Sequence, residues 1–419
     1  MKNRLREDLI KAGTMGRPSA KRMETYGDLT PSEGVTRPTG SRADKEARDF
    51  VVKLMEDAGL DVKVDAVGNI FGTRAGKKQT GTIMTGSHID SVINGGMFDG
   101  ALGVFAAIEA VRRIDEEGFE NERPIEVVVF SSEEGTSFGF ATLGSSVLTG
   151  KVSAEDALKM KNDSGRTLGE ALEEIGYRGR YARSLDTVEY HVELHIEQGP
   201  VLHSKRIPIG IVERIAGVQR IGAVIEGRQD HSGTTPMDMR KDALVAASEI
   251  VLSINRNTLD VARRSSSSLV GAVTKLDVFP NGINTVPGRV EMSVDIRDGI
   301  EESMRKLRDE TLAALTRVRK TYGVRTEYRM IDVKPPVALS DGVEQVIERS
   351  CKNAGLRYIR MNSGAAHDAQ NMASRVKTGM VFIPSVDGRS HTPLEWSEWE
   401  NIETGTGVLT ETIKALAAE

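Results

Sequence analysis

The chain has 419 residues, of which 39% are hydrophobic and 28% are charged, and its formal net charge is -5 at pH 7. A chain of this length is ordinarily too long to fold around a single hydrophobic core, so we expect two domains. The composition is typical of a globular protein rather than a disordered one. The mild acidity argues against binding to nucleic acid, which requires a basic stripe.

The first residues, MKNRLREDLIKAG, have the pattern of an amphipathic helix and lack the apolar stretch and cleavage site of a secretory signal. No apolar run approaches the length of a membrane span. The single cysteine, Cys351, excludes an intramolecular disulfide and fits a reducing compartment. We therefore expect a cytoplasmic protein that does not contact membranes.

The first half of the chain alternates between helix-like and strand-like segments. Helical spacing of apolar residues predicts helices over residues 42–57 and 101–114. Short strands are expected over residues 61–65, 69–73 and 82–85. Residues 125–130 form a continuous apolar run between polar turns, which fits a strand covered on both faces. This alternation indicates a layered α/β domain.

From about residue 213 the order of the elements changes to β-α-β-β-α-β, which is the order of a ferredoxin-like α+β module. The expected elements are a strand over 217–228, a helix over 240–254, strands over 269–278 and 289–297, a helix over 301–322 and a strand over 324–330. After Lys334 the alternation of helices and strands seen in the first half of the chain returns, with a helix over 342–353 and a strand over 379–383. We therefore predict that residues 213–333 are a domain inserted between 1–212 and 334–419.

Histidine and carboxylate residues follow several of the expected strands. His88 lies just past a strand in TGSHIDSV, and Asp99 lies among glycines in NGGMFDGALGV. Open α/β sheets form their ligand sites at the C-terminal ends of strands. Asp90, two residues after His88, could accept the second ring N–H of that histidine, a contact that fixes the tautomer of a metal ligand.

Further candidates follow in the same way. Glu133 and Glu134 come after the buried strand in VVVFSSEEGTSFG, where a turn can direct one carboxylate to a metal ion and the other to a water molecule. His391 lies in a polar loop in VFIPSVDGRSHTPLEW. Strict alternation in YHVELHIEQGP places a set of polar residues on one strand face: His191, Glu193, His195 and Glu197. Such a face is either exposed to solvent or a wall of ligands.

Taken singly, each of these residues is more often structural or solvated than a ligand. Together, histidine nitrogens and carboxylate oxygens are suitable ligands for zinc, manganese, cobalt or nickel. Two such ions, bridged by one carboxylate, lower the pKa of water and polarise a carbonyl group. A nearby glutamate can then take the proton of the water and pass it to a leaving nitrogen.

A set of segments in chain order resembles a known family: TGSHIDSV, GGMFDGALGV, SSEEGTSFG, HIEQGPVL, DHSGTTPM, NTVPGRVEMSVDIRD, SGAAHDAQNMA and PSVDGRSHTPLEW. Over nearly the whole chain the sequence resembles the zinc-peptidase-related amidohydrolases, which include N-carbamoyl-L-amino-acid hydrolases, β-ureidopropionases and allantoate amidohydrolases. The resemblance implies a mixed-sheet, zinc-peptidase-like catalytic domain, with the inserted ferredoxin-like domain acting as a lid and dimerisation domain. It also implies two divalent metal ions per subunit, either Zn²⁺ or Mn²⁺, Co²⁺ or Ni²⁺.

The resemblance further implies the role of each residue. His88 and His195 would bind one ion, Glu134 and His391 the other, Asp99 would bridge the two, and Glu133 would be the general base. The positions that match substrate-binding residues are Gln198, Asn284, Arg297, Ala366 and His367. The planar fork of Arg297 suits a substrate carboxylate, although a structural salt bridge is the alternative interpretation.

His231 matches a lid histidine that reaches the site of the neighbouring subunit and stabilises the oxyanion. Asn284 would also come from the neighbour, so the resemblance implies a homodimer built through the inserted domain and completed by hinge closure. Two departures from the family pattern concern the substrate. Ala366 stands where the family usually has glycine, and Ser137 stands where it often has arginine.

The expected reaction is hydrolysis of an N-carbamoyl-L-amino acid to the amino acid, carbon dioxide and ammonia. Allantoate and N-carbamoyl-β-alanine share the carbamoyl group and the carboxylate, so the same residues would serve all three substrates. An aminoacylase or aminopeptidase is a more remote alternative, which HIEQG and DHSGTTPM disfavour. A binding protein without activity is disfavoured by the complete ligand set and the paired glutamates.

Overall fold

The computed structural model describes residues 4–418, which form two compact units. Unit 1 runs to Glu213 and resumes over Leu339–Met361 and from Ala365 onward. Unit 2 comprises Arg214–Ala338 and the short stretch Asn362–Gly364. The chain therefore leaves unit 1 twice, first for the main part of unit 2 and then for a three-residue piece of it.

A nine-stranded mixed sheet has the order β1-β2-β4-β3-β5-β15-β6-β13, with β14 pairing beside β6. The strands are β1 (Asp61–Val64), β2 (Ile70–Arg74), β3 (Thr82–His88), β4 (Ile125–Phe130), β5 (Val188–Ile196), β6 (Ile209–Ile215), β13 (Val337–Ala338), β14 (Tyr358–Ser363) and β15 (Lys377–Ile383). At its centre β4, β3, β5 and β15 run parallel. Strands β2 and β6 join this group in antiparallel orientation.

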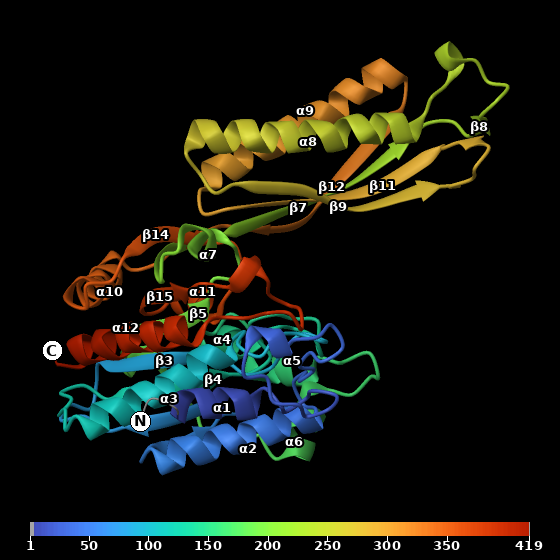
Figure 1. Ribbon diagram of the computed structural model, residues 1–419. Coiled ribbons are helices and arrows are strands. Elements are labelled where there is room, and N and C mark those ends of the chain that lie inside the picture. Colours follow the sequence, from blue (N-terminus) through green and yellow to red (C-terminus); the bar gives the residue numbers. More distant parts are fainter. Residues whose placement is uncertain (1–3, 419) are drawn as a thin grey trace. The chain divides into compact units, whose positions relative to one another are not determined.

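The helices of unit 1 cover both faces of this sheet. They are α1 (Arg4–Ala12), α2 (Arg42–Asp57), α3 (Ala101–Glu116), α4 (Leu143–Leu148), α5 (Ala154–Lys159), α6 (Leu168–Ile175), α7 (Val201–Lys205), α10 (Asp341–Asn353), α11 (Asp368–Met372) and α12 (Trp399–Ala417). Helices α3 and α12 pack against each other and against β3 and β5 (Figure 1). Because α3 packs against the sheet and also against helices α1 and α12, most of its side chains are buried.

Strand β5 shows why the sheet buries polar residues at its centre. Val192, Leu194 and Ile196 join the main hydrophobic core, as their alternation predicts. The other face of β5 is also buried, with His191 and His195 almost inaccessible to solvent. This face is therefore not exposed to solvent, which was one of the two alternatives for it.

Unit 2 has a four-stranded antiparallel sheet of order β12-β7-β11-β9. Its elements are β7 (Gly217–Glu226), α8 (Ala243–Ser265), β9 (Val270–Phe279), β11 (Arg289–Asp298), α9 (Glu301–Tyr322) and β12 (Arg325–Lys334). Two-residue strands β8 (Asp230–His231) and β10 (Thr285–Val286) form a separate pair. Alternating burial along β7 and β11 places their apolar residues in a core with α8 and α9.

The fold class expected from the sequence, an α/β domain with a mixed sheet and a β-α-β-β-α-β module, is confirmed. Several element bounds differ from those expected. Helix α8 continues beyond residue 254 to Ser265, because Thr258 is buried and Val261 packs on the core of unit 2. Strand β12 continues to Lys334 because it pairs with β7 along its length.

Four short 3₁₀ helices complete the inventory of the described residues: Tyr26–Asp28, Leu185–Thr187, Met237–Met239 and Val386–Gly388. Cys351 is buried in α10. No helix within residues 4–418 has both the length and the apolar character to cross a membrane.

Candidate metal centre

The residues expected as metal ligands meet at one edge of the large sheet. They are His88 at the end of β3, Glu134 in the turn after β4, His195 near the end of β5, His391 in the loop after β15, and Asp99 just before α3. Strands β3, β4, β5 and β15 are parallel, so their carboxyl ends lie at the same edge. The fold thus brings together five side chains that are more than 300 positions apart at the extremes of the sequence.

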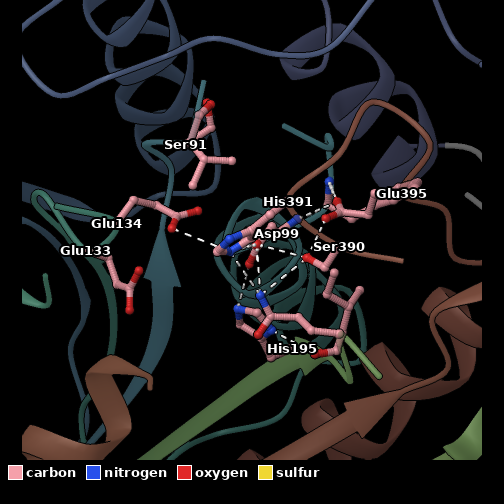
Figure 2. Close-up of polar contacts among 12 residues, drawn as sticks. Ser91, Asp99, Glu133, Glu134, His195, Ser390, His391 and Glu395 are labelled. Atoms are coloured by element: carbon pink, nitrogen blue, oxygen red, sulfur yellow. Dashed lines mark hydrogen bonds and ion pairs between the residues drawn. The ribbon is translucent and has the colours of Figure 1, made fainter. Parts of the chain in front are cut away.

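Asp99 lies at the centre of this group (Figure 2). Its Oδ1 is 3.2 Å from His195 Nε2 and 4.0 Å from His88 Nε2. Its Oδ2 is 3.1 Å from His391 Nε2, and this nitrogen is 3.5 Å from Glu134 Oε2. The two oxygens of Asp99 therefore face two different sets of donors, which is the arrangement that a bridging carboxylate requires.

Backbone carbonyls fix the orientation of two of the imidazole rings. His88 Nδ1 lies 3.0 Å from the carbonyl oxygen of Asp90, and His195 Nδ1 lies 2.8 Å from that of Ile196. A carbonyl oxygen only accepts, so each ring donates from Nδ1 and directs Nε2 toward Asp99. Metal-binding histidines are held in this way by their second ring nitrogen.

The side chain of Asp90 acts differently from expectation. Its carboxylate oxygen is 3.7 Å from His88 Nδ1, beyond hydrogen-bonding distance, so it is the Asp90 backbone that fixes the ring. The carboxylate accepts the backbone N–H groups of Glu133 at 3.1 Å and Glu134 at 3.2 Å. Asp90 therefore anchors the turn that carries both glutamates.

The local backbone is shaped for this geometry. Gly100 has φ +63°, and a Cβ atom there would lie 2.3 Å from His88 Nε2. Left-handed backbone also occurs at Ser132, Gln198 and His391, with φ of 55°, 61° and 55°. Non-glycine residues rarely adopt this conformation, and those that do often mark functional sites.

Burial and charge shift the pKa values of these groups in opposite directions. Burial alone would raise the pKa of Asp99, but hydrogen bonds with His195 and His391 hold it well below its ordinary value. Burial, followed by the charge of Asp99, raises the pKa of Glu134 to about 8. Burial and neighbouring carboxylates raise the pKa of Glu133 well above its ordinary value. The site therefore gathers buried carboxyl groups whose ionised forms a bound cation would stabilise.

The donors fit divalent metal ions. The ligand atoms of His88, Asp99 and His195 lie within 4.8 Å of one another, as do those of Asp99, Glu134 and His391. Oε1 of Glu134 is buried and has no hydrogen-bond partner within the described part of the chain. Mixed imidazole and carboxylate donors suit zinc and neighbouring transition ions. The geometry thus provides two overlapping ligand sets that share Asp99.

Of the other residues singled out in unit 1, two contact this group and two are described by their own surroundings. Gln198 donates from Nε2 to Asp99 Oδ2 at 2.9 Å. His367 is buried, with its ring centroid 4.6 Å from that of His195 in an edge-on arrangement. Ala366 is exposed. Ser137 donates its hydroxyl to the carbonyl of Thr39 at 3.0 Å.

His231 and Asn284 belong to unit 2 and are close to each other. The pairing of β8 with β10 sets His231 opposite Thr285, and the Ser232 amide donates to the Asn284 carbonyl at 3.0 Å. His231 Nδ1 accepts the backbone N–H groups of Gly233 at 3.0 Å and of the next residue at 3.2 Å. Because Nδ1 accepts, the proton of the neutral ring lies on Nε2, which leaves this exposed side chain as a donor.

Arg297, on β11 of unit 2, forms the salt bridge that was its alternative interpretation. Its Nε donates to Asp295 Oδ1 at 2.8 Å, and its Nη2 donates to Oδ2 at 3.4 Å. Its Nη1 donates to the carbonyl of Gly364 at 3.3 Å. Asp295 also accepts from Arg220 Nε at 2.8 Å, so one carboxylate is shared by two guanidinium groups. A guanidinium has five N–H donors, and these contacts leave the group able to bind a further anion.

Residues that sequence reasoning missed also contact the centre. Glu395 accepts the backbone N–H groups of Phe98 and Asp99 at 3.0 Å each. Ser390 Oγ lies 2.8 Å from Glu395 Oε2 and 3.2 Å from Asp99 Oδ2. The signal that could have revealed Glu395 is a carboxylate within the otherwise apolar PLEW of SHTPLEW.

The chain matches peptidase family M20/M25/M40 over residues 84–415. It is 40% identical over 396 residues to an N-carbamoyl-L-amino acid amidohydrolase of Geobacillus stearothermophilus, which covers 92% of this chain and 94% of that relative. It is 35% identical over 392 residues to an allantoate amidohydrolase of Bacillus subtilis (strain 168), with 92% and 93% covered. An amidase of the hydantoinase/carbamoylase family from Burkholderia multivorans has a crystal structure that matches with a TM-score of 0.93 at 35% identity, covering 100% of this chain and 98% of that one. These matches confirm the resemblance seen in the sequence, and the chain belongs to peptidase family M20/M25/M40.

Proposed function

We propose that this protein is a metal-dependent amidohydrolase that converts an N-carbamoyl-L-amino acid to the amino acid, carbon dioxide and ammonia. The observation that carries the proposal is the position of Asp99 between two sets of donors, with Glu133 buried beside them. Relatives named for N-carbamoyl-L-amino acids and for allantoate support the choice of a linear C–N bond outside a peptide.

Two divalent ions held by the five ligands would supply Lewis acidity, which polarises a carbonyl group and lowers the pKa of water. Glu133 Oε2 lies 3.7 Å from His88 Nε2, so its carboxylate borders the ligand group without being central to it. We assign Glu133 the task of taking the proton from the attacking water and delivering it to the leaving nitrogen. Burial and nearby carboxylates raise the pKa of Glu133 above its ordinary value in the metal-free protein.

Residues of unit 2 would complete the site in a homodimer. The Nε2–H of His231 from a second copy would donate to the oxyanion as water adds to the carbonyl. Asn284 from the same copy would hold the substrate, and Arg297 would bind its carboxylate through a two-point ion pair. Unit 2 would thus act as lid and dimerisation domain.

The competing substrates carry the same two groups. Allantoate and N-carbamoyl-β-alanine both present a carbamoyl group and a carboxylate, and a relative named for allantoate supports the first of these as an alternative. An aminoacylase or aminopeptidase would use the same metal chemistry on a different amide.

Release of ammonia tests the proposal. The protein, loaded with Mn²⁺, Zn²⁺, Co²⁺ or Ni²⁺, is incubated with N-carbamoyl-L-amino acids and their D enantiomers, with N-carbamoyl-β-alanine and with allantoate. We expect the highest kcat/KM on an N-carbamoyl-L-amino acid. The same preparations are also incubated with N-acetyl amino acids and dipeptides, whose cleavage is followed by release of the free amino acid. Cleavage of these compounds without ammonia release from any carbamoyl or ureido compound would contradict the proposal and support the aminoacylase or aminopeptidase alternative.

A further inference from the structure

A buried carboxylate outside the expected ligand set connects two loops of the metal centre. Glu395 has an exposed fraction of only 1%. Its Oε1 accepts the backbone N–H groups of Phe98 and Asp99, and its Oε2 lies 2.8 Å from Ser390 Oγ (Figure 2). One side chain therefore holds the backbone of the central ligand Asp99 and the residue next to His391.

The carboxylate of Glu395 occupies the space beside Gly96. A Cβ atom on Gly96 would lie 2.0 Å from Glu395 Oε1, so any larger residue at position 96 would displace the carboxylate. The neighbouring side chains Phe98 and Trp396 pack edge to face, with ring centroids 5.3 Å apart. These contacts press the two loops together and keep Glu395 away from solvent.

The hydroxyl of Ser390 has one proton and two carboxylates within reach. Its oxygen is 2.8 Å from Glu395 Oε2 and 3.2 Å from Asp99 Oδ2, and it can donate to only one of them at a time. The shorter distance favours donation to Glu395. As long as Glu395 accepts this proton, Ser390 does not occupy a lone pair of Asp99 Oδ2, the oxygen that faces His391.

We infer that Glu395 is a positioning residue of the metal centre, which fixes the Asp99 backbone and keeps the Ser390 proton away from Asp99 Oδ2. The inference rests on the proposed function, because it requires that Asp99 binds metal. When residues that hydrogen-bond to metal ligands are replaced, metal affinity typically falls by about 10–100-fold.

Glu395→Gln separates positioning from packing, since glutamine has nearly the same size. Its amide oxygen can accept the two backbone N–H groups, which directs its NH₂ group at Ser390 Oγ. The Ser390 hydroxyl oxygen must then accept a hydrogen bond from the new glutamine at position 395. Its own proton turns to Asp99 Oδ2 instead. We expect Zn²⁺ affinity to fall by about 10–100-fold, while the unfolding midpoint of the metal-free protein stays close to that of the wild type.

The test is a Zn²⁺ titration of metal-free full-length protein against a competing chelator, together with thermal unfolding of the same samples. Asp242→Asn is the matched control, because Asp242 accepts the N–H groups of Leu244 and Val245 in unit 2. The control should keep wild-type Zn²⁺ affinity. A second substitution, Ser390→Ala in the Glu395→Gln background, should restore much of the lost affinity, because no hydroxyl proton can then turn to Asp99.

Gly96→Ala provides an independent route if Glu395→Gln does not fold, since it displaces the carboxylate without removing its charge. We expect it to weaken Zn²⁺ binding as well. Wild-type Zn²⁺ affinity in a folded Glu395→Gln or Gly96→Ala protein would overturn the inference while leaving the proposed function intact. A wild-type protein that binds no Zn²⁺ would instead overturn the proposed function, and the inference with it.

Discussion

Gly100 lies directly against the ring of His88: a Cβ atom at position 100 would be 2.3 Å from His88 Nε2, the nitrogen that faces Asp99. The glycine also has φ +63°, a conformation that residues with a side chain rarely adopt. The candidate metal centre thus requires a residue without a side chain at position 100, because a Cβ atom there would displace the His88 ring.

Gly100→Ala is therefore expected to abolish binding at the ion site that includes His88, because the methyl group must push the imidazole away. The matched control is Gly118→Ala, since Gly118 has φ +66° and nothing within 4 Å of an added Cβ. Both variants should lose about 1 kcal/mol or more of stability from the backbone conformation, with the larger loss in Gly100→Ala because of the clash with His88, and only Gly100→Ala should lose metal. Equal metal content in the two purified variants, measured by mass spectrometry, would contradict this prediction.

Glu133→Gln is expected to lower kcat by about 10²–10⁴-fold while both ions stay bound, because only the general base is lost. The amide still fits the buried space beside His88. Metal content and kcat are measured on the same preparation. Glu174→Gln, at an exposed salt bridge with Arg166, is a control that should keep full activity. A Glu133→Gln protein with wild-type turnover would refute the role of the residue.

Arg297→Ala is expected to raise KM for N-carbamoyl amino acids by about 10–100-fold, with a smaller change in kcat, because a charged hydrogen bond to the substrate is worth about 1.5–3 kcal/mol. Arg220→Ala removes the other guanidinium on Asp295 and leaves Arg297 in place, so its effect should be smaller. Steady-state kinetics on both variants compare the two. Unchanged KM in Arg297→Ala would assign the residue to the salt bridge with Asp295 alone.

His191 predicts a pH dependence of stability. Burial lowers its pKa from 6.5 to about 3, and neither ring nitrogen has a hydrogen-bond partner within residues 4–418. Between these two pH values the unfolded chain binds the proton and the folded protein does not. This histidine therefore makes stability fall as the pH falls from about 6.5 toward 3, by up to about 1.4 kcal/mol per pH unit.

His191→Leu should remove this contribution. Denaturant unfolding of the metal-free protein at pH 6 and pH 4.5 measures the free energy of unfolding of both proteins. The variant is expected to lose less stability than the wild type over this interval. An identical loss in both proteins would show that His191 does not carry the effect.

The grouping of the candidate metal ligands could be predicted in large part from the sequence, because the expected ligands follow strands. Apolar runs identify β3 and β4, and parallel strands end at one edge, so His88 and Glu134 could be expected together. The motif set then assigned roles that no single fragment could support. The alternation of β5 gave the correct face for His195, although not its burial.

Other features depend on distances that sequence spacing does not define. Asp90 follows His88 by two residues, so a contact between them is expected, but this spacing does not determine whether the backbone or the carboxylate makes it. Glu395 is nearly 300 positions from Phe98, and only the packing of two loops shows that they meet. The stretch Asn362–Gly364 belongs to unit 2 through contacts such as that between Gly364 and Arg297.

We propose that two metal ions share Asp99 as a ligand, and the metal content of the purified protein distinguishes this arrangement from others. Wild-type protein and the Asp99→Asn variant are loaded with Zn²⁺ or Mn²⁺, freed of excess ions and analysed for metal per subunit, with circular dichroism as a check of folding. The wild type is expected to hold two ions per subunit, and Asp99→Asn is expected to lose one or both, together with ammonia release from N-carbamoyl amino acids. A folded Asp99→Asn protein with wild-type metal content and activity would contradict the proposal that Asp99 binds metal.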